Sequence, residues 1–293
     1  MSDFRPQEPV VEVTPEVLWG PPQPYYPPPP PPRQRVWLHV LLYLLTVAST
    51  VMVGGWSFAI GLLSILTAHE FGHYFAAKWY RVPTSLPYFI PFPFSLFGTL
   101  GAFIRMSPFI PNRRALFDIA AAGPLAGMVL AVPFSFLGIM WSRIVPKASL
   151  GDNVISLGEP YLFQLLSWLA HGRVGEDMDM LLHPLAFAGW AGMFVTALNL
   201  LPIGQLDGGH VTHALFGNRS RLVAQSIFGG LAVFSIVTKT YTWVPLLILL
   251  FVFGIRHPRT MDDGEPIGLS RLAVGGLLAA TFLLCFSLVP IKI

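Results

Sequence analysis

Charged side chains are scarce in this sequence, and cysteine is almost absent. Asp, Glu, Lys and Arg make up 11% of the 293 residues, whereas a soluble domain carries about 25%. This shortage argues against an ordinary water-soluble globule. The single cysteine, Cys285, excludes an internal disulfide and lies in an apolar run, where a lone cysteine packs as a small hydrophobe.

Clusters of basic residues are also missing. The formal net charge is +3, and no run of five basic residues occurs. Proteins that bind single-stranded nucleic acid combine a basic groove with aromatic stacking platforms, and the sequence has no such pattern. Nucleic acid is therefore not an expected partner, and the Lys and Arg residues are better explained as signals of membrane topology.

Long apolar runs, by contrast, are abundant, and hydrophobic residues make up 54% of the chain. A helix needs about 20 predominantly apolar residues to cross a bilayer. The runs that approach this length are Val36–Val53, Trp56–Trp79, Ala115–Val145, His183–Leu215, Leu222–Lys239, Tyr241–Ile255 and Leu269–Val289. Because several are imperfect, the sequence predicts an all-α polytopic membrane protein with six or seven transmembrane helices, in contact with the lipid bilayer.

Residues 1–35 have a different composition and end in "PPQPYYPPPPPPRQR". Such a proline-rich segment favours extended polyproline II structure and cannot build a core. We expect a disordered N-terminal tail over residues 1–35. It either serves as a tether or binds a proline-recognising partner domain.

The distribution of Lys and Arg predicts the orientation of the chain. With seven spans and a cytoplasmic N-terminus, 13 of these residues lie on the cytoplasmic side, and five lie on the other: Arg143, Lys147, Arg173, Lys239 and Lys292. This is a clear positive-inside bias. Since no cleavable signal peptide precedes the first apolar run and the acidic N-terminus is unlike an organellar presequence, we expect a multi-pass protein of the prokaryotic cell membrane.

Two connections between apolar runs carry patterns of their own. The stretch "FSLFGTLGAFIRM", Phe94–Met106, mixes aromatic and β-branched residues with two glycines, which predicts a short β-hairpin at the membrane surface. The stretch "PYLFQLLSWLAHG", Pro160–Gly172, predicts an interfacial helix with Trp168 at the level of the headgroups.

The first candidate for chemistry is "HEFGH", inside the second apolar run. At 3.6 residues per turn, His69 and His73 lie on one helix face and can chelate one metal ion. Glu70 is next to them, where it can take a proton from a water at the metal. The alternative is a pair of packed histidines, but ionisable groups inside a membrane helix are functional by default.

A third ligand is expected from "NLLPIGQLDGGH", Asn199–His210. Pro202 and three glycines interrupt the apolar run, and interrupted helices at membrane depth are tolerated where they line a cavity. Asp207 is one of few acids in the spans, so a metal is the natural partner for its charge; the alternative is a helix cap. Asn199 either holds substrate or an oxyanion, or makes an interhelical hydrogen bond.

Together, "HEFGH" and "NLLPIGQLDGG" resemble the paired HExxH and NxxPxxxxDG signatures of the site-2 protease family of intramembrane zinc metalloproteases. The resemblance covers roughly Val36 to Pro258 and extends to the subgroup that includes plastid and cyanobacterial members. It implies one Zn²⁺ per chain, bound by His69, His73 and Asp207, with Glu70 as the catalytic base. Residues 36–293 then form a transmembrane metalloprotease domain, without the PDZ insertion that many relatives carry.

The expected activity is hydrolysis of peptide bonds within or next to transmembrane segments of single-span membrane proteins, as in regulated intramembrane proteolysis. A substrate helix must first unwind, and an exposed strand edge would hold it extended. Gly98, Thr99 and Gly101 in the hairpin are the candidates for this edge; alternatively, the hairpin is purely structural. A metal or proton transporter and an inactive membrane-protein binder are the rival functions. The sequence leaves the oligomeric state open.

Other residues are expected to have structural parts. Gly123 and Gly127 suit close helix packing, and Pro124, between them, suits a kink. Asp118 is expected to be solvated or paired with Arg113 or Arg114. His210 and His213, three residues apart, could bind a metal, but their position at the cytoplasmic end of a helix favours a solvated face.

Overall fold

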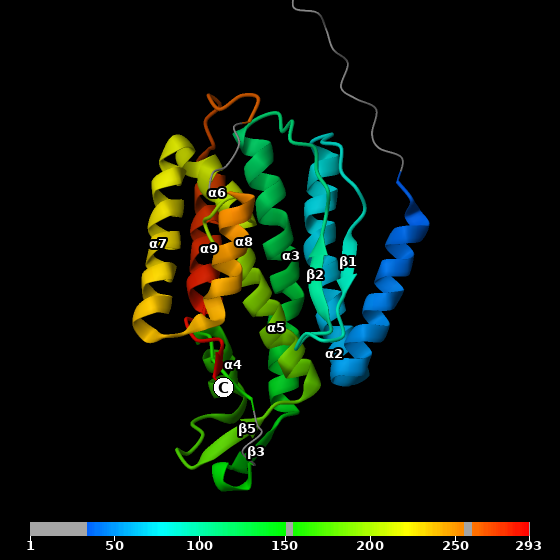
Figure 1. Cartoon of the computed structure of the whole chain (residues 1–293), viewed down its shortest axis with the longest axis vertical. Coiled ribbons are helices and arrows are strands. Elements are labelled where there is room, and N and C mark those ends of the chain that lie inside the picture. Colours follow the sequence, from blue (N-terminus) through cyan, green and yellow to red (C-terminus); the bar gives the residue numbers. More distant parts are fainter. Residues whose placement is uncertain (1–33, 151–154, 255–259, 293) are drawn as a thin grey trace, which may run out of the picture. The chain divides into compact units, whose positions relative to one another are not determined.

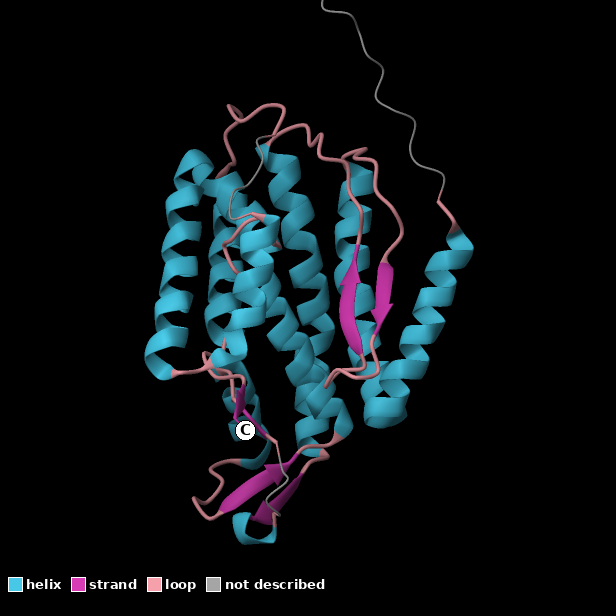
Figure 2. Ribbon diagram, in the orientation of Figure 1, coloured by secondary structure: helices cyan, strands magenta, loops and turns pink. Residues whose placement is uncertain are grey.

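The computed structural model describes residues 34–150, 155–254 and 260–292, which belong to one compact unit, Gln34–Ile293. Helices dominate it, with a few short strands (Figures 1 and 2). The helices are α2 (Val36–Trp79), α3 (Arg113–Met140), α4 (Tyr161–His171), α5 (Pro184–Asn199), α6 (Asp207–Phe216), α7 (Ser220–Thr238), α8 (Val244–Phe253) and α9 (Leu269–Cys285). The predicted disordered tail falls mostly on residues 1–33, outside the described residues, and stays a prediction.

The long helix α2 is two helices joined at a break. Gly55 has φ 75° and ψ −179°, a conformation that glycine adopts without steric cost. The two arms run in opposite directions from this point (Figure 1), and they match the predicted runs Val36–Val53 and Trp56–Trp79. A straight helix of 44 residues would be about 66 Å long, about twice the hydrocarbon thickness of a bilayer, and the break avoids that length.

Three helices are long and apolar enough to cross a membrane, judged by length and composition: Val36–Trp79, Arg113–Met140 and Asp207–Thr238. The segments Tyr241–Val252 and Leu269–Cys285 are shorter apolar helices. The helical character expected from the sequence is therefore confirmed among the described residues, while the count of six or seven spans stays a prediction. The predicted run His183–Leu215 is interrupted, since α5 ends at Asn199 and α6 begins at Asp207.

The core lies where α2, α3 and α5 pack together. Phe58, Leu62 and Ile65 of α2 are buried against the α5 residues Trp190 and Met193. Small residues allow this close approach: a Cβ added at Gly192 would lie 2.8 Å from the Ile65 side chain. Packing through small residues is typical of helices in membranes, and here it packs the second arm of α2 against both α3 and α5.

Strands β1 (Tyr88–Pro91) and β2 (Thr99–Phe103) form an antiparallel hairpin, with Tyr88 opposite Phe103. The predicted hairpin lay within Phe94–Met106, so the observed one begins earlier and uses residues 92–98 as its connection. This connection is held by the first arm of α2, where the Ser49 hydroxyl donates to the carbonyl of Gly98 at 2.5 Å. The location of this hairpin at a membrane surface stays a prediction.

The other strands lie near the opposite end of the helices from residues 260–268 (Figure 1). Strand β3 (Arg143–Pro146) pairs with β5 (Met178–Leu181), and β4 (Ser156–Leu157) pairs with β6 (Ile291–Lys292). The helix predicted within Pro160–Gly172 is present as α4, which buries Phe163 and Leu166 and exposes Trp168. An exposed apolar face of this kind suits an interfacial position.

Candidate metal centre and active site

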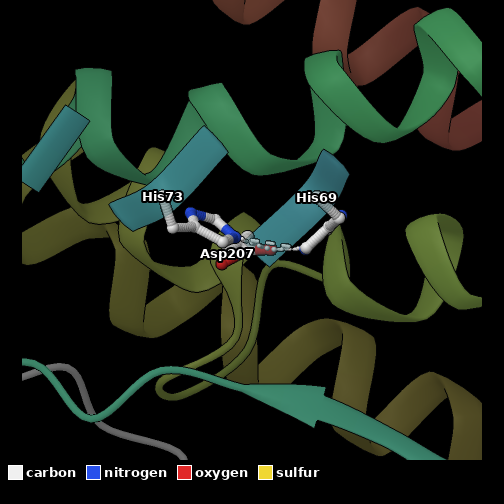
Figure 3. A group of neighbouring side chains, drawn as sticks. All are labelled: His69, His73 and Asp207. Carbon is white, nitrogen blue, oxygen red and sulfur yellow. Dashed lines mark hydrogen bonds and ion pairs between the residues drawn. The ribbon is translucent and has the colours of Figure 1, made fainter. Parts of the chain in front are cut away.

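Three side chains from two helices meet at one point (Figure 3). His69 and His73 come from consecutive turns of α2, and Asp207 is the first residue of α6. The Oδ2 atom of Asp207 lies 3.2 Å from Nε2 of His69 and 3.2 Å from Nε2 of His73. The two Nε2 atoms are 3.1 Å apart. The three donor atoms therefore form a nearly equilateral triangle.

This triangle fits a zinc ion. Tetrahedral zinc with bonds of about 2.0–2.1 Å to nitrogen and oxygen places neighbouring ligand atoms about 3.3 Å apart, close to the separations of 3.1–3.2 Å found here. Two imidazoles and one carboxylate are also a donor set that catalytic zinc uses, with a fourth position left for water or substrate. The residues present thus match the metal that the sequence predicts.

The interruption between α5 and α6 places Asp207 at this point. Pro202 prevents a continuous helix, and Gly204 has φ 58°, so the chain turns sharply before α6. Gly209 then packs against the turn, because an added Cβ would lie 2.8 Å from the carbonyl oxygen of Ile203. Gly204 in the turn and Gly209 packed against it therefore allow a tight connection, which directs the Asp207 carboxylate towards α2.

The two candidate ligand histidines are oriented by neighbouring groups. Nδ1 of His73 lies 2.8 Å from the carbonyl oxygen of Ile119, so Nδ1 carries the proton and Nε2 presents its lone pair. Hydrogen bonds of this kind to backbone carbonyls fix ring orientation in metal sites. The side-chain Nδ2 of Asn199 lies 3.2 Å from Nε2 of His69, which places Asn199 at the edge of the triangle.

Glu70, the candidate base, is buried beside the ligands. His69, Glu70 and His73 are 3%, 5% and 7% exposed, so their side chains are largely shielded from solvent. A cavity nevertheless reaches them. This cavity has a volume of about 200 Å³. It is lined by residues of α2, α3, the segment after β2, and the turn before α6; these include Glu70, Ile104, Leu116, Asn199 and Gln205.

The hairpin residues singled out in the sequence lie outside this lining. Gly98 sits against the first arm of α2, and the Thr99 hydroxyl donates to the carbonyl of Ile90 within the hairpin at 2.8 Å. Instead, Ala102 and Phe103 at the end of β2 line the cavity. The hairpin is therefore next to the site, whereas the part of Gly98, Thr99 and Gly101 in holding substrate stays a prediction.

The expectations for His213 and Asp118 are wrong. His213 is buried, with Nδ1 3.3 Å from the hydroxyl of Ser220. His210 is half-buried and lines the cavity. Asp118 binds neither Arg113 nor Arg114. It accepts hydrogen bonds from Arg271 at 2.8 and 2.6 Å and from the Tyr80 hydroxyl. No local signal in the sequence pointed to Arg271, which is 153 positions away.

Comparison with known proteins identifies a peptidase family and several probable zinc metalloproteases as similar to this chain. The model of peptidase family M50 matches residues 57–238. The chain is 32% identical to "Probable zinc metalloprotease EGY1, chloroplastic" of Oryza sativa subsp. japonica, over 80% of this chain and 40% of the relative. It is 31% identical to the protein of the same name from Arabidopsis thaliana, over 80% of this chain and 42% of that relative.

A third relative is "Probable zinc metalloprotease EGY2, chloroplastic" of Oryza sativa subsp. indica, at 32% identity over 75% of this chain and 41% of the relative. The chain thus spans about two fifths of the length of the curated relatives it matches. No solved structure matches it significantly. The family match includes the α2 arm with both histidines and the start of α6 with Asp207. The chain belongs to peptidase family M50.

Proposed function

We propose that this protein is a zinc endopeptidase that hydrolyses peptide bonds within or next to transmembrane segments of single-span membrane proteins. The observation that carries the proposal is the triangle of His69, His73 and Asp207, with Glu70 buried beside it in the same cavity. Membership of peptidase family M50 and the similarity to probable zinc metalloproteases support it. The apolar helices around the cavity support a substrate that arrives from the bilayer.

Each residue has a distinct task in this reaction. His69, His73 and Asp207 would hold the zinc ion, which when bound would act as a Lewis acid that polarises the scissile carbonyl and lowers the pKa of water. Glu70 takes a proton from the attacking water and later gives it to the leaving amine. The amide of Asn199, next to His69, donates a hydrogen bond to the oxygen on which negative charge develops.

Substrate capture is the second part of the proposal. A helix conceals its peptide groups in its own hydrogen bonds, so the scissile segment must become extended before cleavage. Strand β2 runs towards the cavity, and Ala102 and Phe103 at its end line it. Pairing of the substrate with an edge of this hairpin would hold an extended segment next to the metal, with Gly98, Thr99 and Gly101 on the strand or at its start.

We place the site in the cytoplasmic half of a prokaryotic cell membrane, with the N-terminus in the cytoplasm. The support is the excess of Lys and Arg on one side, including Arg113, Arg114 and Arg271. These arginines lie at the ends of α3 and α9 that neighbour residues 260–268: Arg114 forms an ion pair with Glu265 at 2.7 Å, and Arg113 donates to the carbonyl of Asp263 at 3.4 Å. No nucleic acid partner is expected.

A metal or proton transporter is the rival function. Such a protein would need ionisable groups along a path across the membrane, whereas the cluster of His and acidic ligands within the described residues is a single closed triangle. A transporter also has no specific need for Glu70 beside the first histidine. Both points favour hydrolysis.

The test combines zinc content with cleavage of a model single-span substrate in reconstituted vesicles. Glu70→Gln is expected to retain zinc and lose cleavage, since the metal ligands stay and the base is removed. Asp207→Ala is expected to weaken both. Glu159→Gln, an exposed acid outside the site, serves as the matched control. Full proteolysis by the Glu70→Gln variant would reject the assigned mechanism.

A further inference from the structure

Helix α3 provides no metal ligand, yet it lies directly against the two metal-binding rings. The carbonyl oxygen of Ile119 receives the hydrogen bond from Nδ1 of His73 at 2.8 Å. Gly123, one turn further along α3, faces the same ring. A Cβ added at Gly123 would overlap His73, with Nε2, Cδ2 and Cε1 as its nearest atoms.

The next glycine on this face of α3 is different. A Cβ added at Gly127 would lie 3.4 Å from Cβ and Nδ1 of His69, an ordinary contact distance. The two glycines of "AAAGPLAG" therefore have unequal surroundings, although they are one turn apart on the same helix. Only at Gly123 does the position of a metal-binding ring depend on the absence of a side chain.

We propose that Gly123 is a positioning residue of the metal centre. By lacking a side chain, it leaves the space in which the His73 ring lies, with Nδ1 on the carbonyl of Ile119 and Nε2 directed at Asp207. The inference rests on the proposed function, because it takes His73 to be a metal ligand. An added methyl group would force the ring out of this position, and a tetrahedral site tolerates little movement of a ligand.

Gly123 could instead serve the close packing of α2 against α3, and the experiment has to distinguish this role from that of making space for the His73 ring. Glycine also lets helix backbones approach closely, and α2 and α3 are close here, since a Cβ added at Gly72 would lie 2.5 Å from the carbonyl oxygen of Ala122. If Gly123 served only this approach, its substitution would harm helix packing whether or not residue 73 carried a ring. If Gly123 serves the ring, truncating His73 removes the conflict.

The experiment uses the full chain in detergent and four variants: Gly123→Ala, Gly127→Ala, His73→Ala, and His73→Ala combined with Gly123→Ala. Zinc affinity is measured by competition with a chromophoric chelator, and the thermal midpoint is measured on metal-free protein. We expect Gly123→Ala to weaken zinc binding about 10- to 100-fold, the range for groups that orient ligands, and Gly127→Ala to leave it within about twofold.

In the metal-free protein, Gly123→Ala is expected to lower the thermal midpoint when His73 is present and to leave it unchanged when His73 is alanine. An equal loss in both backgrounds would assign Gly123 to backbone packing and overturn the inference. Zinc binding by Gly123→Ala within about twofold of the parent would overturn it as well. These measurements do not involve cleavage, so a protein that binds zinc through His73 but does not hydrolyse the substrate would contradict only the proposed function.

Discussion

The side-chain Nδ2 of Asn199 lies 3.2 Å from Nε2 of His69, although 130 positions separate the two residues in the chain. Asn199 is the last residue of α5, immediately before the turn that leads to Asp207. When the lone pair of His69 Nε2 is used by the metal, it no longer accepts a hydrogen bond from the amide. We therefore expect the amide of Asn199 to be available to the substrate.

Replacing Asn199 should separate chemistry from metal binding. Asn199→Ala is expected to lower kcat about 100-fold, the cost of removing one donor to a developing oxyanion, while the zinc content stays at one per chain. Turnover of a model transmembrane substrate and zinc analysis of the same sample measure the two effects. Asn218→Ala, at an exposed asparagine, is the control; an unchanged kcat for Asn199→Ala would assign the residue to helix packing.

Removing zinc should destabilise the protein. A ligand that binds only the folded state contributes about 2.7 kcal/mol at 100 times its Kd, so chelation is expected to lower the thermal midpoint and added zinc to restore it. Asp207→Ala should abolish most of this zinc-dependent shift, whereas Asp179→Ala, on β5 outside the cavity lining, should keep it. A shift of parental size in Asp207→Ala would exclude Asp207 as a ligand.

The pair Asp118 and Arg271 should contribute to stability. Their side chains are 30% and 25% exposed, so solvent weakens the attraction, but two hydrogen bonds to a charged group remain. We expect Arg271→Met to cost about 1–2 kcal/mol, with Asp118→Asn costing a similar amount. In the double variant the losses should be less than additive. Unfolding in detergent measures each variant, with Arg173→Met as control, and full additivity would show that the pair is not coupled.

The hairpin should be more sensitive to substitution at Gly98, in its connection, than at Gly101, in β2. Both have positive φ, 71° and 100°, so alanine is strained at either. Only at Gly98 would an added Cβ also meet the first arm of α2, 2.7 Å from the carbonyl oxygen of Ser49. Gly98→Ala is expected to cost about 2–3 kcal/mol and Gly101→Ala about 1 kcal/mol. Equal losses in equilibrium unfolding would contradict the close contact.

The sequence singles out the three side chains that meet in the structure, because two of them are neighbours on one helix and the third is one of few acids in the apolar runs. The spacing of His69 and His73 places them on one helix face, and few acids in the apolar runs can serve as a third ligand, which leaves Asp207. The sequence also predicts a break near Gly55, because Gly54 and Gly55 separate the apolar runs Val36–Val53 and Trp56–Trp79. These features depend on helix periodicity and on the cost of burying charge, both visible in a single sequence.

Features that depend on distant pairing could not be predicted in this way. Asp118 has arginines close by at positions 113 and 114, and nothing local indicates that Arg271 is its partner. Likewise, β1 begins next to Pro87 and ends at Pro91, and proline is unfavourable in most strands, so the pattern did not reveal where the hairpin starts. The burial of His213 depends on Ser220 and the packing around α6, which helix periodicity alone cannot supply.

The contact between Arg271 and Asp118 has a consequence for the size of the functional unit. The match to peptidase family M50 ends at residue 238. Helix α9 lies beyond it, and its Arg271 binds Asp118 of α3 and Tyr80 at the C-terminal end of α2. Helix α3 also contains Ile119. Gly275 of α9 also faces Leu215 of α6. A minimal catalytic fragment cut at the family boundary would leave Asp118 without its cation, one residue from the carbonyl that orients His73. We therefore expect a fragment that keeps α9 to be more stable than one cut at residue 238, where the family match ends.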